Sequence, residues 1–154
     1  MQLSDHFKLS EFTRSQTASR LGIDNTPSEH VKKSLKLLAE AVLEPVRAHF
    51  GKPVRISSGY RSLALNEAVG SKSSSQHIRG EAADFEIPGV ANLEIALWIS
   101  KHLQYDQVIW EYGSMKDPSA GWIHCSYKKE GNRNIVLTVM DNTTTQGLPT
   151  EEKN

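Results

Sequence analysis

The sequence predicts an α+β domain in which helices pack on a small antiparallel sheet. Its first half holds the clearest helical pattern, an apolar stripe at three- and four-residue spacing through residues 31–46. Its second half holds short segments in which apolar and polar residues alternate, as in strands with one buried face. Helices followed by a strand meander favour an α+β fold. We therefore expect one domain over residues 1–140, followed by a disordered tail over 141–154 that is rich in Thr, Asn and Glu.

The N-terminal segment is expected to be a short helical lead-in over residues 1–26. Phe7, Leu9 and Phe12 are its apolar anchors. A helix from Ser15 ends before Gly22, because glycine is typical of helix C-terminal ends.

A longer helix is predicted to begin at Thr26, which we interpret as the N-cap, with Pro27 at the first helical position and Glu29 closing a capping box. Pro45 lacks a backbone N–H and should bend or break this helix, leaving a last turn to about Phe50. The apolar stripe of the helix consists of Val31, Leu35, Leu38, Val42 and Val46.

The remaining elements alternate between strands and short helices. We expect strands over residues 53–58, 82–87, 105–111, 121–127 and 133–139, and helices over 63–69 and from 91 or 92 to 103. The polar turn 113–121 should join two of these strands into a hairpin.

His77 and Asp84 are the first candidates for chemistry. Their separation of seven positions is too long for the adjacent-turn pair of a His-Glu-x-x-His zinc helix. It suits a loop that delivers His77, turns at Gly80 and enters a strand at Ala82. On that strand Asp84 alternates away from the core. Imidazole and carboxylate both bind zinc, and a catalytic zinc takes three protein ligands and keeps an open position.

His124 is the best candidate for a third ligand. In the segment 121–127 it shares the polar face with Trp122 and Ser126, opposite Ile123. A single histidine is more often a surface or hydrogen-bonded residue, and this is the interpretation for those without a ligand partner at useful spacing: His6, His30, His49 and His102.

The ligand pattern resembles a known family. Residues 75–84 read Ser-x-His-x-x-Gly-x-Ala-x-Asp, and residues 122–124 read Trp-Ile-His. Together they are similar to the zinc D-Ala-D-Ala carboxypeptidase family, whose members include vancomycin-resistance dipeptidases and phage L-alanyl-D-glutamate endolysins, and to which the hedgehog fold is related. The resemblance covers roughly residues 7–140 and is specific, because the positions fit at fixed spacing.

The resemblance implies one zinc ion per chain, bound by His77, Asp84 and His124. It also implies that Arg61, in the sequence Ser-Gly-Tyr-Arg-Ser, lines the site and binds a substrate carboxylate or polarised carbonyl. A guanidinium fork can make two parallel hydrogen bonds to a carboxylate, although an arginine after a strand is more commonly a surface charge. Ser75 and Trp122 are expected beside the ligands or the substrate; Ser75 is not expected to act as a nucleophile.

The general base does not follow from the resemblance. Many relatives carry an acidic residue three positions before the second zinc histidine, and here that position is Gly121. Glu111 is our candidate, because it ends the strand expected to pair with the His124 strand; a solvated strand-end carboxylate is an equally common situation. Glu81 and Asp117 are weaker candidates, since Glu81 occupies a free position of the motif and Asp117 lies in the variable turn.

These observations favour a zinc metallopeptidase that cuts peptidoglycan stem peptides, with the L-alanyl-D-glutamate bond preferred. The alternatives are a D-alanyl-D-alanine carboxypeptidase, a non-catalytic zinc-containing wall-binding virion module, which the absence of an acid at Gly121 favours, and an interaction domain without metal.

Composition limits the other partners. The formal net charge is +0, so no basic footprint indicates nucleic acid. The single cysteine, Cys125, excludes an internal disulfide and is expected in the core. No apolar run is long enough for a membrane span, and residues 1–8 lack the regions of a signal peptide. We expect a monomer that is made in the cytoplasm and reaches the cell wall by phage-type release.

Overall fold

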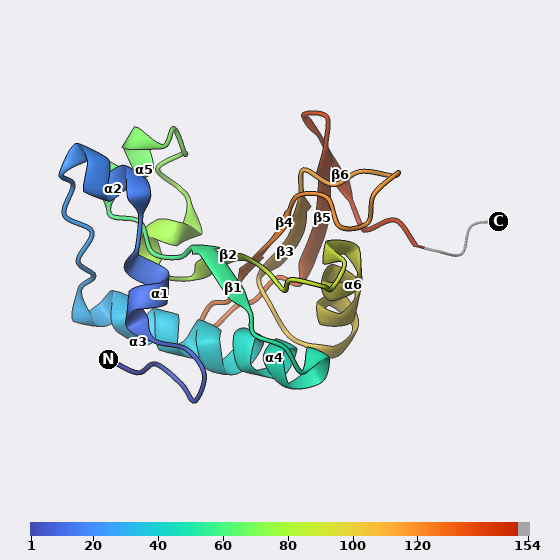
Figure 1. Ribbon diagram of the computed structural model, residues 1–154, viewed down its shortest axis with the longest axis horizontal. Helices are drawn as coiled ribbons and strands as arrows, with labels where there is room; N and C mark the ends of the chain where they lie inside the picture. The colour runs from blue at the N-terminus through green and yellow to red at the C-terminus, as the bar shows by residue number, and fades with distance from the viewer. Residues whose placement is uncertain (151–154) are drawn as a thin grey trace.

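A six-stranded sheet forms the framework of the molecule (Figure 1). The computed structural model describes residues 1–150. In chain order the strands are β1 (Arg55–Ser58), β2 (Ala82–Glu86), β3 (Gln107–Glu111), β4 (Trp122–Ser126), β5 (Ile135–Met140) and β6 (Thr143–Gln146). Their order across the sheet is β1-β2-β4-β3-β5-β6. This arrangement places β2, β4 and β3, which carry most of the predicted site residues, next to one another.

The sheet is mixed, whereas the sequence predicted an antiparallel one. Most neighbouring strands are antiparallel, but β3 and β5 run parallel, with Gln107 opposite Ile135. The chain leaves β4 and crosses the start of β3 before it enters β5, so β3 lies between them. Alternation along a strand determines which face is buried but not which strand becomes its neighbour. The α+β class is confirmed, and the wholly antiparallel detail was wrong.

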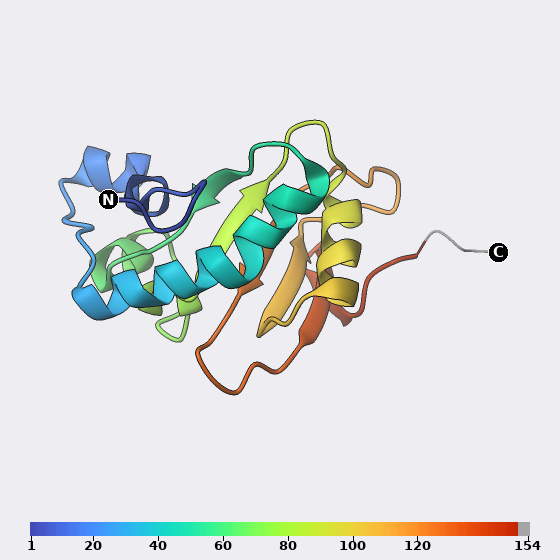
Figure 2. The ribbon, with the colours of Figure 1, turned by 90° about the horizontal axis from the view of Figure 1, so that it is seen from below.

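Helices lie beside the sheet and across one of its faces. They are α1 (Leu9–Thr13), α2 (Gln16–Leu21), α3 (Glu29–Leu38), the π-helical η1 (Ala39–Leu43), α4 (Glu44–Phe50), α5 (Leu63–Ala68), the 3₁₀ helix η2 (Gln76–Arg79) and α6 (Asn92–His102). Figure 2 shows α3 to α4 and α6 on the same side of the sheet, where they bury its apolar face. None of the helices in the described part of the chain has the length and hydropathy needed to span a bilayer.

The core matches the predicted stripes. Apolar residues of α3 to α4 meet the inward side chains of the strands, among which Phe85, Trp110 and Cys125 are fully buried. Ala82 was expected on the opposite face and is buried as well, where it pairs with the buried Ser126. The two central strands are therefore covered on both faces near this pair.

The start of α3 differs from the prediction. Ser28 is the N-cap, and its hydroxyl accepts a hydrogen bond from the backbone N–H of Val31 at 3.2 Å. Thr26 was the wrong choice. The helix begins at Glu29, so Pro27 precedes it and does not occupy its first turn. Serine and threonine are both good N-caps, so the two positions compete closely in the sequence.

The helix does not break at Pro45. A wider π-helical turn, Ala39–Leu43, lies directly before it, and the chain continues helically to Phe50. A proline lacks the N–H that a regular turn would use, and its ring conflicts with the carbonyl group four residues earlier. The π turn provides an irregularity at this point, so the apolar stripe stays continuous.

The predicted tail is wrong for part of its length. Thr143–Gln146 forms β6, which pairs antiparallel with β5 through a turn at Asp141 and Asn142. Both turn residues have positive φ, 50° and 64°, as a two-residue hairpin turn requires. Leu148 packs against the core. The ordered chain therefore extends past the boundary expected at residue 140, and residues 151–154 lie outside the described part.

Candidate active site

Three side chains that could hold a metal ion meet on the face of the sheet opposite the helices α3 to α4. Asp84 on β2 and His124 on β4 are direct cross-strand partners, and η2 brings His77 beside them. The Oδ1 atom of Asp84 lies 2.9 Å from Nδ1 of His124 and 3.4 Å from Nε2 of His77. One donor atom from each of the three residues lies within 4.8 Å of the others. The predicted ligand set is thus brought together in one place.

The ring of His77 is oriented by the backbone. Its Nδ1 atom lies 2.6 Å from the carbonyl oxygen of Gly59, which leaves Nε2 directed at Asp84. The His77 side chain is almost completely buried. A hydrogen bond of this kind fixes the orientation of a metal-binding imidazole ring. His77 therefore has the orientation that a metal ligand needs.

Local hydrogen bonds shape the turn that carries His77. The hydroxyl of Ser75 accepts a hydrogen bond from the backbone N–H of His77 at 3.2 Å, which caps η2. Gly80 ends the 3₁₀ helix with a φ of 74°, a conformation natural to glycine. Ser75, predicted near the ligands or the substrate, thus contacts the backbone of a ligand.

The electrostatics of Asp84 suit a ligand that stays ionised. Burial disfavours its charged form, but hydrogen bonds with His124 and His77 outweigh this effect and hold the pKa of the Asp84 carboxyl well below its usual range. A carboxylate flanked by two imidazoles is a suitable donor set for a divalent cation.

The residues present fit a zinc ion. Bonds of about 2.0–2.1 Å at tetrahedral angles place neighbouring donor atoms about 3.3 Å apart. The two separations that involve Asp84 bracket this value. Three protein ligands leave the fourth position of a tetrahedron for water or substrate. Among residues 1–150, the side chains that lie close enough together to hold a metal ion are those of His77, Asp84 and His124.

Glu111 lies on the same face of the sheet as the ligands. Its cross-strand partner is Trp122, and His124 pairs with Ile109, so alternation places Glu111 and His124 on one side. Glu111 is half-buried. Burial raises the pKa of its carboxyl, the charge of His124 lowers it and that of Asp84 raises it again. The two ligands therefore affect Glu111 electrostatically, and the net upward shift is suited to proton transfer.

Arg61 is joined to the ligand turn. Its backbone N–H donates to the carbonyl oxygen of His77 at 3.1 Å, and its Nη1 atom lies 3.5 Å from the hydroxyl oxygen of Ser58. Burial lowers the pKa of the Arg61 guanidinium, and the negative charge of Asp84 opposes this shift. The buried Nε atom has no hydrogen-bond partner among the described residues. The Arg61 guanidinium therefore lies beside the candidate ligands and carries a donor that no described residue satisfies.

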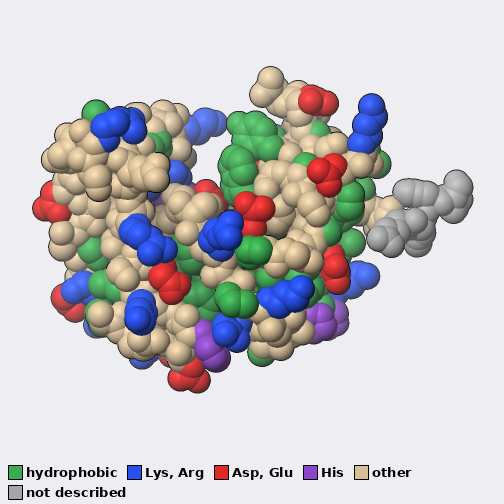
Figure 3. All heavy atoms as spheres, in the orientation of Figure 1, with side chains coloured by type: hydrophobic (Ala, Val, Ile, Leu, Met, Phe, Trp, Pro, Cys, Tyr) green, Lys and Arg blue, Asp and Glu red, His purple; other side chains and the backbone are tan. Residues whose placement is uncertain are grey.

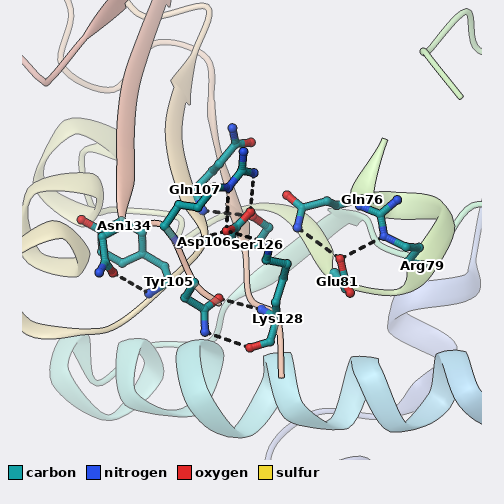
Figure 4. A network of polar contacts seen from close by, with 11 residues as sticks. Gln76, Arg79, Glu81, Tyr105, Asp106, Gln107, Ser126, Lys128 and Asn134 are labelled. Atoms are coloured by element: carbon teal, nitrogen blue, oxygen red, sulfur yellow. Dashed lines mark hydrogen bonds and ion pairs between the residues drawn. The ribbon is translucent and has the colours of Figure 1, made fainter. Parts of the chain in front are cut away.

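The two weaker base candidates have other contacts. Figure 4 shows Glu81 beside Gln76 and Arg79, and its Oε1 atom accepts hydrogen bonds from both at 3.2 Å. Asp117 is exposed and caps its own turn by accepting a hydrogen bond from the backbone N–H of Ser119. Neither residue belongs to the triad, so Glu111 is the candidate that shares its face.

The other histidines have the structural roles expected from sequence. His6 lies 2.7 Å from a carboxylate oxygen of Glu44, and His49 and His102 stack on Trp98. His30 is exposed on α3.

Two residues near the site escaped the sequence analysis. The buried Asn92 donates hydrogen bonds from Nδ2 to the carbonyl oxygens of Ser119, Ala120 and Gly121, which fixes the turn before β4. Tyr112 follows Glu111 with a positive φ of 56°, and its exposed ring lies 5.0 Å from that of Trp122. For Tyr112, the one signal in the sequence was its position directly after a strand. No sequence pattern singled out Asn92.

Comparison with known proteins agrees with this geometry. The family model described as Peptidase M15, the zinc D-Ala-D-Ala carboxypeptidase-like family, matches residues 5–126. A comparison with curated proteins found no match. The matched region contains His77, Asp84 and His124, together with Arg61 and Glu111. Because it spans most of the chain, the protein belongs to the Peptidase M15 family.

Proposed function

We propose that the protein is a zinc-dependent peptidase that hydrolyses the stem peptides of peptidoglycan. The observation that carries this proposal is the convergence of the donor atoms of His77, Asp84 and His124 within 4.8 Å. Membership of the Peptidase M15 family supports peptide hydrolysis as the reaction class.

The ion would be held by Nε2 of His77, a carboxylate oxygen of Asp84 and Nδ1 of His124. When bound, zinc supplies Lewis acidity toward the scissile carbonyl and lowers the pKa of water to about 7. The carbonyl group of Gly59 keeps the His77 ring in place for this role.

Glu111 is the proposed general base and acid. It accepts a proton from the attacking water molecule and returns one to the leaving amine, which breaks the carbon–nitrogen bond. Its raised pKa, caused by burial, brings the carboxyl closer to the pH at which both transfers are efficient. Its place on the face of His124 provides access to the reacting groups.

Arg61 is the proposed anchor for a substrate carboxylate. Its unpartnered Nε atom and its position beside the ligand turn support this role. The bond that we propose is L-alanyl-D-glutamate, in which the α-carboxylate of the γ-linked D-glutamate lies next to the bond that is cut. A D-alanyl-D-alanine substrate also presents a carboxylate close to its scissile bond and is the alternative.

The biological role that we propose is that of an endolysin, which degrades the cell wall once the membrane has been opened. The similarity of the ligand pattern to phage L-alanyl-D-glutamate endolysins supports this role. Loss of turbidity of permeabilised cells would measure it directly.

Mass spectrometry of fragments released from purified peptidoglycan tests the activity. Zinc-loaded protein should release peptides with a new N-terminal D-glutamate, whereas release of free D-alanine would identify the alternative bond. Glu111→Gln should retain zinc and release little product. Glu94→Gln, on the exposed side of α6, is the matched control and should behave like the unchanged protein.

Two results would overturn parts of the proposal. Equal release by Glu111→Gln and the unchanged protein would remove Glu111 as the base. A zinc-loaded protein that binds several wall types and releases nothing from any of them would favour the wall-binding module.

A further inference from the structure

A second groove begins where the active site ends. It has a volume of about 850 Å³ and lies between the segment that carries α1 and α2 on one side and β1 with α5 on the other. Ser58 and Arg61 line it, and both also adjoin the metal ligands. A peptide held at Arg61 could therefore continue into this groove.

The hydrogen bonds around Ser58 join the groove to the active site. Ser58 pairs with Asp84 across β1 and β2, and its hydroxyl lies within reach of Nη1 of Arg61. The pairing skips one residue between Ile56 and Ser58, so the backbone of Ser57 has no place in the regular ladder. Since β1 is an outer strand of the sheet, it can offer main-chain groups to an extended peptide.

Charged side chains of both signs line the groove. They are also spread over the face of the molecule drawn in Figure 3. Arg14 and Arg20 stand on its α1–α2 wall, both exposed, and Arg61 lies at the end nearest the metal ligands. Within residues 1–150, the guanidinium groups of Arg14 and Arg20 take part in no hydrogen bond or ion pair. Glu11 lines the same groove. Two cationic groups and one carboxylate complement a zwitterion that carries both a carboxylate and an ammonium group.

We propose that this groove binds the third residue of the stem peptide and prefers diaminopimelate to lysine. The inference rests on the proposed function, in which Arg61 holds the carboxylate of the preceding D-glutamate. Diaminopimelate ends its side chain in a carboxylate and an ammonium group, whereas lysine ends in an ammonium group alone. Arg14 and Arg20 bind the extra carboxylate, and Glu11 binds the ammonium group.

A matched pair of tripeptides provides the test. L-Ala-γ-D-Glu-meso-diaminopimelate and L-Ala-γ-D-Glu-L-Lys differ by one carboxylate. Calorimetric titration into zinc-loaded Glu111→Gln protein measures binding without cleavage. The diaminopimelate peptide should bind about tenfold more tightly, the free-energy equivalent of one good charge-assisted contact.

Substitution of the two arginines should remove this preference. Arg14→Gln combined with Arg20→Gln should weaken binding of the diaminopimelate peptide about tenfold and leave the lysine peptide unchanged. Arg55→Gln is the control and should change neither Kd, because Arg55 is an exposed arginine of β1 that does not line the groove. Unchanged thermal unfolding of the double variant would show that it is folded.

The results of these experiments test the proposed subsite and the proposed peptidase activity separately. Equal affinity for the two tripeptides, a preference that survives the double substitution, or no measurable binding of either peptide would overturn the proposed subsite. A preserved preference in a protein that hydrolyses neither tripeptide would overturn the proposed activity while leaving the subsite in place.

Discussion

A Cβ atom added to Gly121 would lie 1.7 Å from the carbonyl oxygen of Glu111. Gly121 also has a φ of 65°, in the left-handed region. The position at which many relatives carry an acidic residue is therefore closed to any side chain in this protein. The residue whose backbone closes it is Glu111, the proposed replacement for that acid. The missing acid at Gly121 and its proposed replacement, Glu111, are therefore in direct contact.

Gly121→Ala should lower the free energy of unfolding by more than about 3 kcal/mol. The left-handed conformation alone costs a non-glycine residue about 1–2 kcal/mol, and the overlap with Glu111 adds to it. Gly131→Ala is the control, because Gly131 has a φ of 78° and no atom within 4 Å of the added Cβ. Urea unfolding measures both variants, and an equal loss in the two would show that the overlap relaxes without cost.

Gly59→Ala should weaken zinc binding about 10- to 100-fold, since partners that orient a ligand have effects of this size. The added Cβ would lie 2.7 Å from backbone atoms of Phe12, and the resulting shift would move the carbonyl oxygen that holds His77. Chelator competition measures the affinity. Gly70→Ala, where the added Cβ meets nothing within 4 Å, should lower stability without changing zinc affinity; the same affinity in all three proteins would contradict the role of Gly59.

The value of kcat/KM should fall on the acid side with a midpoint above pH 4.5. Burial raises the pKa of Glu111 above its ordinary value of 4.5, and a general base must be deprotonated to act. Activity is therefore present above the raised pKa and is lost as the pH falls through it. Rates between pH 4 and 8, with zinc content determined at each pH, measure the profile. The residual activity of Glu111→Gln should lack this midpoint, and the same midpoint in both proteins would assign it to another group.

Arg133→Ala should lower the free energy of unfolding by about 2–3 kcal/mol, because it leaves the fully buried carboxylate of Asp106 without its main partner. Arg133 donates to Asp106 from Nε at 3.0 Å and from Nη2 at 2.6 Å. Figure 4 shows the surroundings of Asp106, with Ser126 and Lys128 nearby. Lys128, at 3.7 Å, keeps part of the charge balance. Arg133→Lys should retain more of the stability than alanine does, and urea unfolding of the two variants at pH 7 measures the difference.

The same pair predicts a pH dependence. Hydrogen bonds from Arg133 lower the pKa of Asp106 to about 2 from an ordinary value of 3.8. A lowered folded-state pKa contributes stability that is complete above the unfolded value and is lost as the pH falls through the folded one. The difference between the unchanged protein and Arg133→Ala should therefore shrink between about pH 4 and pH 2. A difference that stays constant through this window would contradict the assignment.

The convergence of the three candidate ligands could be predicted from the strand pattern together with the family resemblance. His77, Asp84 and His124 lie at positions where alternation and a short turn leave few choices of face. The orientation of His77 could not be predicted, since it depends on the backbone of Gly59, which is distant in sequence. The same limit applies to the charged groove, whose walls are Arg14 and Arg20 on one side and β1 on the other.

The errors in the fold arose where composition or local pattern was ambiguous. The polar segment that contains β6 was assigned to a tail, although Asp141 and Asn142 are residues that accept the positive φ of a tight hairpin turn. The parallel pairing of β3 and β5 depends on a crossover of the chain, which leaves no local signature.

The match to the family ends at residue 126, whereas the hydrogen-bonded sheet continues through β5 and β6. A chain cut after Ser126 would keep every proposed ligand but turn β3 into an outer strand with unsatisfied main-chain groups. Exposed strands of this kind recruit other chains. The C-terminal hairpin therefore covers the edge of β3, the strand that bears Glu111, and satisfies its main-chain groups.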